Sequence, residues 1–153
     1  MAHAGKIGRG HQRLGQSRAL CGLMGIAPRG AGRDSAVNES PLFARTYDFL
    51  LWLIPQVQKF PRAHRFGVAE RIQRLALDFQ DGIVAAGKSQ KEKRFEKLAQ
   101  ADIHLEQLRT WVRFARDNHL ITVRQYEHAA RSMSEMGKLL GAWLKQSREL
   151  PLM

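Results

Sequence analysis

The apolar residues of this chain recur at alternating steps of three and four in four helix-length segments. Residues spaced this way fall on one side of an α-helix, so each segment predicts a helix with one narrow apolar stripe. Narrow stripes pack against near-parallel neighbours, which is the geometry of a helix bundle. The stripes are Phe43, Tyr47, Leu50, Ile54 and Val57; Val68, Ile72, Leu75, Phe79 and Ile83, with one slip near Gly82; Leu98, Ala101, Leu105, Leu108, Val112 and Ala115; and Ala129, Met133, Met136, Leu140 and Trp143.

Local signals mark where these helices begin and end. Ser89 with Glu92 and Thr122 with Gln125 both fit a capping box, which predicts the starts of the third and fourth helices. Gly87 is predicted to end the second helix. The short connections after the second and third helices favour antiparallel neighbours. The sequence therefore predicts an all-α, antiparallel up-down four-helix bundle.

The chain divides near residue 40. Residues 1–39 are rich in glycine and basic residues and lack helical or strand periodicity, so we expect a disordered basic tail before a bundle spanning 40–149. No apolar run approaches the roughly 18–20 residues that cross a bilayer. The single cysteine, Cys21, excludes an intrachain disulfide framework. These features predict a cytoplasmic protein without a membrane span.

The outer faces of the predicted helices carry most of the basic excess. With 25 Lys and Arg against 14 Asp and Glu, the formal net charge is +11, which favours a polyanionic partner such as nucleic acid. A solvated outer face is the simpler interpretation of any single stripe. Local ion pairs of Arg109 with Glu106, Arg113 with Asp117 and Arg74 with Asp78 are also expected. The candidate binding residues are Arg71, Arg74, Arg109, Arg113, Arg116, Arg131, Lys138 and Lys145, and Arg124 shares the seven-residue spacing of the last three.

Aromatic residues beside the stripes suggest a subunit contact. A body of about 110 residues has limited core in which to bury them, and tryptophan is enriched at interfaces. A wide buried face within one chain is the alternative. The candidate residues of a homo-oligomer interface are Trp52, Trp111, Phe114, Gly137, Gly141 and Trp143.

No set of residues suggests catalysis. Di-metal bundles use paired Glu-x-x-His motifs, which this chain lacks. Asp102, His104 and Glu106 are two apart and so scatter around a helix instead of converging on a metal. There is also no phosphate-binding loop of the G-x-x-x-x-G-K-[ST] type. We expect neither enzymatic activity, nor a metal, nor a cofactor.

Several segments, in order, resemble one protein family. They are TYDFLLWLIP at 46–55, KFPR at 59–62, AAGKS at 85–89, LRTWVRF at 108–114 and GKLLGAWLK at 137–145. Together they are similar to the accessory variability determinant (Avd) of diversity-generating retroelements, over about residues 40–146. The same superfamily includes four-helix proteins encoded in intervening sequences of 23S ribosomal RNA genes.

The resemblance implies a bacterial or phage-encoded subunit that forms a ring-shaped homopentamer with a basic surface. Such proteins bind RNA or DNA and the reverse transcriptase of the element, and support mutagenic cDNA synthesis without being the polymerase. By position, Arg109 and Arg113 match basic family residues tied to partner binding. The tail before residue 40 departs from the family pattern.

The sequence thus predicts a non-enzymatic, nucleic-acid-binding accessory subunit that binds a reverse transcriptase and template RNA. The alternative is a structural protein of the 23S rRNA intervening-sequence type, which would dock an acidic protein or rRNA. A role at a membrane surface would need a broad apolar helix face, and the stripes are narrow.

Overall fold

Residues 40–149 are described by a computed structural model, and their regular structure is helical throughout. The predicted tail, 1–39, lies outside the described residues. One helical turn, α3 (Arg62–His64), and a π-helical segment, η1 (Arg65–Ala69), lead directly into the second long helix. The long helices are α2 (Pro41–Gln58), α4 (Glu70–Lys88), α5 (Lys91–Asp117) and α6 (Val123–Glu149).

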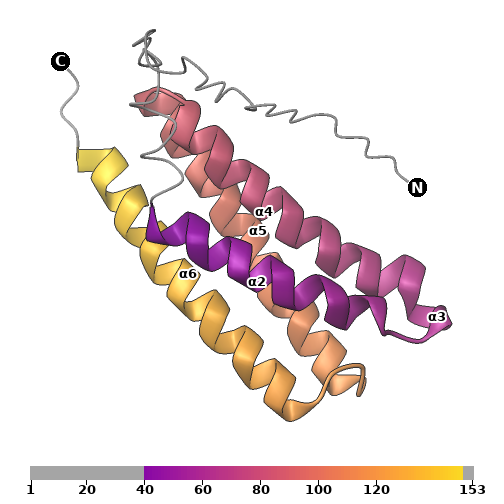
Figure 1. The fold of residues 1–153 in the computed structure, drawn as a ribbon. Helices are drawn as coiled ribbons and strands as arrows, with labels where there is room; N and C mark the ends of the chain where they lie inside the picture. Colours follow the sequence, from indigo (N-terminus) through magenta and orange to yellow (C-terminus); the bar gives the residue numbers. More distant parts are fainter. Residues whose placement is uncertain (1–39, 150–153) are drawn as a thin grey trace, which may run out of the picture.

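The four long helices form an antiparallel bundle (Figure 1). Helix α2 packs against α4 and α6, and α5 packs against the same two helices from the other side. Going round the bundle, the order is therefore α2, α4, α5 and α6, with successive helices running in opposite directions. The predicted all-helical fold and its up-down arrangement are confirmed.

The predicted stripes of the last three helices form most of the core. Every stripe residue of α5 is buried, and so are those of α4 and of η1 before it. On α6 the stripe from Ala129 to Leu140 is buried and Trp143 is half-buried. Helix α4 approaches α5 closely at Gly82, where an added Cβ would lie 3.3 Å from the Cβ of Ala101. The slip in the α4 pattern thus marks a close contact between two backbones.

The stripe predicted for α2 is partly wrong. Tyr47 is 59% exposed, whereas its neighbour Thr46 is buried. Thr46 tolerates burial because its hydroxyl donates a hydrogen bond to the carbonyl of Leu42 at 2.7 Å, which satisfies the polar group within the helix. The buried residues of α2 are Leu42, Phe43, Thr46, Phe49, Leu50, Leu53 and Val57.

One of the two predicted capping boxes is present. The backbone N–H of Thr122 donates to the side chain of Gln125 at 2.8 Å, and the N–H of Gln125 donates to the Thr122 hydroxyl at 3.1 Å. The box predicted at Ser89 is wrong, because its hydroxyl donates back to the carbonyl of Ala85 at 2.7 Å and α5 begins after Gln90 without a side-chain cap.

The end of α4 also differs from the prediction. Gly87 lies inside the last turn, and the helix ends at Lys88. Arg94 of α5 takes over the capping: its Nε donates to the carbonyl of Ala86 at 3.2 Å and its Nη2 to that of Ser89 at 2.9 Å. A cation at the negative end of a helix also interacts favourably with the helix dipole. The α4–α5 turn is therefore closed by an arginine from the following helix.

Replacing Thr122 with alanine should lower the free energy of unfolding by about 1 kcal/mol, because one N–H at the start of α6 loses its acceptor. Gln90→Ala is the control at the start of α5, where no side-chain cap exists, and should change stability by less than about 0.5 kcal/mol. Urea denaturation of both variants measures the difference. Equal losses would contradict the assignment of the caps.

Candidate nucleic-acid interface

The outer face of α6 carries a row of exposed cations. The buried residues Ala129, Met133 and Met136 fix the rotation of α6. Positions 124, 131, 138 and 145, which are spaced by seven, therefore point away from the core. The structure places Arg124, Arg131 and Lys138 there without an ion pair to any other residue of 40–149, while Lys145 lies 3.8 Å from Glu149. These residues, Arg124, Arg131, Lys138 and Lys145, are called the α6 basic stripe below.

Arg109 does not join this exposed row. Its Nη2 reaches across to α6 and donates to the carbonyl of Met133 at 3.1 Å, while Nη1 pairs with Glu106. The guanidinium lies directly over Gly137, where an added Cβ would overlap Nη2. This contact accounts for Gly137 within one chain, without a second subunit. Arg109 therefore joins α5 to α6, and its side chain is only 35% exposed.

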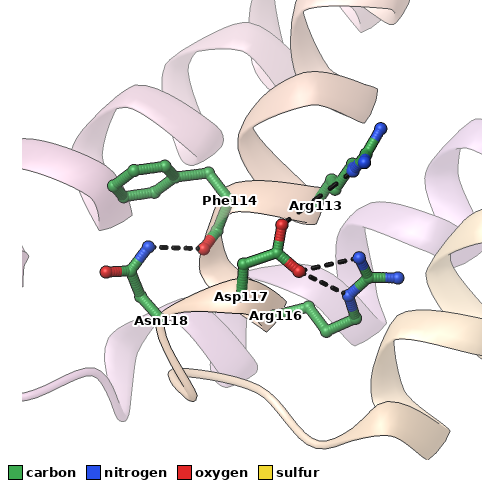
Figure 2. A network of polar contacts seen from close by, with 5 residues as sticks. All are labelled: Arg113, Phe114, Arg116, Asp117 and Asn118. Carbon is green, nitrogen blue, oxygen red and sulfur yellow. Dashed lines mark hydrogen bonds and ion pairs between the residues drawn. The ribbon is translucent and has the colours of Figure 1, made fainter.

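Arg113 and Arg116, also on α5, share one carboxylate (Figure 2). Arg116 donates through Nε and Nη2 to Asp117 at 2.9 and 2.7 Å, and its guanidinium lies 4.3 Å from the ring centre of Tyr126. The hydrogen bond with Asp117 raises the pKa of Arg116 above its usual value. Arg113 is 3.9 Å from the same carboxylate and its side chain is 69% exposed. Of the three, Arg113 is the most available to a partner.

The predicted residues of α4 lie apart from the α6 basic stripe. Helix α4 packs between α2 and α5, so Arg71 and Arg74 cannot extend the outer face of α6. Arg74 pairs with Glu70 at 2.6 Å, one turn before it, instead of with the predicted Asp78. The structure therefore divides the candidate cations between two parts of the surface.

The tryptophans pack within the chain's own bundle. Trp52 is stacked on Phe49 and has its ring centre 4.5 Å from that of His128. Trp143 packs against Phe43, and both tryptophans are half-buried. Trp111 is also half-buried, and it packs against the more exposed Phe114 in a T-shaped arrangement with the ring centres 5.6 Å apart. Burial within one chain thus explains most of the aromatic surplus.

Exposed apolar side chains gather instead where α2 meets α4. Arg45 and Trp52 contact α6, so Tyr47 and Leu51 occupy the opposite flank of α2. Gly82 faces α5, which puts the exposed apolar residues of α4 on its other flank. A groove of about 920 Å³ between Val57 of α2 and residues 65–81 continues this surface. The α2–α4 apolar face consists of Tyr47, Leu51, Phe66, Leu77 and Val84.

The sequence contained a signal for this face that the stripe pattern concealed. Tyr47 and Leu51 are four apart, and Leu77 and Val84 are seven apart, so each pair follows its own second line along a helix. Because Tyr47 was assigned to the core stripe, the exposed pair on α2 was not recognised.

Within residues 40–149 there is also no group of three acidic, histidine or cysteine side chains placed to hold a metal.

The fold and surfaces define a basic, all-helical bundle with a row of cations on α6 and an apolar face where α2 meets α4. None of the helices formed by residues 40–149 has the length and apolarity needed to cross a membrane. The model of the bAvd-like family matches residues 42–147, which is well over half of the chain. The chain therefore belongs to the bAvd-like family, and the resemblance found in its sequence motifs is confirmed.

A solved structure supports the same fold. A protein of unknown function from the S23 ribosomal protein family of Bacteroides thetaiotaomicron is similar with a TM-score of 0.63 and 20% sequence identity. The match covers 74% of this chain and 98% of that protein. At this identity the likeness establishes the fold alone. No curated protein matches the chain.

The contact of Arg109 with Gly137 can be tested by two glycine substitutions on α6. Gly141→Ala should raise the free energy of unfolding by about 0.5–1 kcal/mol, because alanine favours a helix and nothing lies within 4 Å of the new Cβ. Gly137→Ala should gain less or lose stability, since Arg109 must move. In an Arg109→Ala background the two substitutions should become equivalent by urea denaturation, and a persistent difference would contradict the contact.

Proposed function

We propose that this protein is a non-enzymatic accessory subunit of a diversity-generating retroelement. In this role it binds RNA, and DNA through the same surface, and holds the template against the element's reverse transcriptase during mutagenic cDNA synthesis. Membership of the bAvd-like family supports the accessory role. The particular reverse-transcriptase and nucleic-acid partners are our proposal.

The α6 basic stripe is the observation that carries the proposal. Its cations are exposed and, from Arg124 to Lys138, have no ion pair within residues 40–149. Exposed cations spaced along one helix fit the phosphates of a nucleic acid backbone, which give affinity without base choice. Arg113 adds an exposed guanidinium on the adjoining helix. We therefore assign the main phosphate contacts to the α6 basic stripe with Arg113.

We also propose that the protein forms a homo-oligomer through its α2–α4 apolar face. Exposed large apolar side chains that cluster on one face are typical of interaction surfaces. This face lies across the bundle from the pair α5 and α6, so assembly through it leaves the α6 basic stripe accessible. A ring of five subunits, which the family resemblance implies, is the assembly that we expect.

Removing two cations from the α6 basic stripe should weaken RNA binding and flatten its salt dependence. In the Arg131→Ala, Lys138→Ala variant, the slope of log affinity against log salt should fall in magnitude by about 1.4 for single-stranded RNA, because about 0.7 is lost for each phosphate contact. Fluorescence anisotropy titrations at several salt concentrations measure the slope.

The matched control removes the same charge elsewhere. Lys59→Ala with Arg62→Ala, directly after α2 and on α3, removes one exposed lysine and one exposed arginine and should leave the slope nearly unchanged. Equal effects of the two double variants would contradict a site on α6. Absence of RNA binding by the unaltered protein, together with capture of an acidic protein, would instead favour the structural alternative.

A charge placed in the α2–α4 apolar face should dissociate the oligomer. Leu51 and Val123 have similar exposures, 60% and 64%, but Val123 lies at the start of α6, outside this face. Leu51→Glu should therefore reduce the mass measured by light scattering to that of one subunit, and Val123→Glu should not. An unaltered mass in Leu51→Glu would show that another surface forms the contact.

A further inference from the structure

A second groove lies between α5 and α6, near the end of the bundle where α6 finishes. It has a volume of about 690 Å³. Its apolar lining consists of Phe95, Ala99 and Ile103 from α5 with Gly141 and Leu144 from α6, and its polar lining of Asp102, Lys145, Arg148 and Glu149. Lys145 belongs to the α6 basic stripe, so this α5–α6 groove adjoins the proposed phosphate contacts.

The groove is open because of a glycine, Gly141, that the packing of residues 40–149 does not require. At Gly137 the missing Cβ makes room for Arg109. At Gly141, apart from the neighbouring backbone of α6 itself, no heavy atom of residues 40–149 lies within 4 Å of where a Cβ would be. Ile103, across from it, is half exposed to solvent. Within residues 40–149 nothing fills the space above Gly141, so a ligand can occupy it.

The chemistry of the lining suits a flat, neutral group beside a phosphate. The guanidinium of Arg148 lies 5.7 Å from the ring centre of Phe95, so a cation and an aromatic ring already meet at one end. The exposed Asp102 would repel a phosphate placed inside the groove, but its carboxylate can accept hydrogen bonds from amino groups. Lys145 and Lys138 stand on the outer side of α6, within one stripe.

We propose that the α5–α6 groove binds an unpaired base of a single-stranded nucleic acid. The base enters above Gly141 and stacks on Phe95, while Lys145 and Lys138 contact the phosphates on either side of it. This inference rests on the proposed nucleic-acid-binding function and adds that the preferred ligand is single-stranded.

A duplex cannot use the groove in this way. Its bases are stacked and paired, so their flat faces are not available to a side chain. An unpaired base can turn out of the strand and stack on an aromatic ring, which adds affinity with little dependence on base identity. The duplex keeps only the phosphate contacts of the α6 basic stripe. The groove therefore distinguishes the two forms, although the stripe does not.

The test fills the groove without changing any charge. Gly141→Leu should weaken binding of a single-stranded RNA of about 12 nucleotides by roughly fivefold or more, and Phe95→Ala should do the same by removing the stacking ring. Binding of a blunt RNA duplex of the same sequence should change by less than about twofold in both variants, because its contacts are electrostatic. Ala44→Leu, which adds an apolar side chain at an exposed position of α2 outside this groove, is the control and should bind both probes nearly as the unaltered protein does.

Thermal unfolding shows whether each variant keeps its fold, and fluorescence anisotropy at one fixed salt concentration gives the affinities. Unchanged single-strand binding in Gly141→Leu and Phe95→Ala would overturn the inference. So would an equal loss for both probes, since a base site must separate them. If the unaltered protein binds neither probe, the proposed function itself is refuted and not the groove alone.

Discussion

The packing of the buried stripes against one another determines what every other surface of this protein can do. Gly82 of α4 lies against Ala101 of α5, and this close approach fixes how the two helices are rotated. On α6 the buried Ala129 and Met136 fix the rotation in the same way. A residue two positions beyond such a core residue must point away from the bundle. Arg131 and Lys138 occupy those positions, so core packing orients the charges without contacting them.

The bundle order also separates two kinds of surface. Five exposed apolar side chains form the α2–α4 apolar face, whereas Arg124, Arg131 and Lys138, which have no ion pair within residues 40–149, lie on α6. Helix α2 contacts α6 on the flank opposite α4. There Arg45 of α2 pairs with Glu135 of α6, with Nε 3.6 Å from the carboxylate. An assembly through the α2–α4 apolar face would therefore bring several basic stripes into one particle. Linked binding sites of this kind raise the apparent affinity for a long polyanion without any new contact.

How much of this could be predicted from the sequence depends on the range of the interaction. The α5 stripe from Leu98 to Ala115 was predictable because it is aliphatic and strictly periodic. The choice of Thr46 over Tyr47 for the core depends on a hydrogen bond within α2 that periodicity does not encode. The contact of Arg109 with Gly137 joins residues on different helices, and no local pattern indicates it. The excess of basic residues could be read from the composition. Which of these side chains are free to bind a ligand could not, because that depends on the ion pairs and hydrogen bonds they make in the fold.

The difference between a basic residue and one that is free to bind a ligand decides which residues should be substituted to map the binding site. The resemblance implied a part in partner binding for Arg109, but in the structure Arg109 bonds to Met133 and Glu106 and covers Gly137. Its substitution removes a link between two helices, so lost binding in such a variant would confuse stability with recognition. Arg131 and Lys138 make no such link within residues 40–149, and surface substitutions of this kind usually change stability by less than about 0.5 kcal/mol. A loss of nucleic-acid binding in Arg131 or Lys138 variants therefore reports a lost contact with the ligand and not a loss of stability. Substitutions on α6 are the ones that test where the nucleic acid binds.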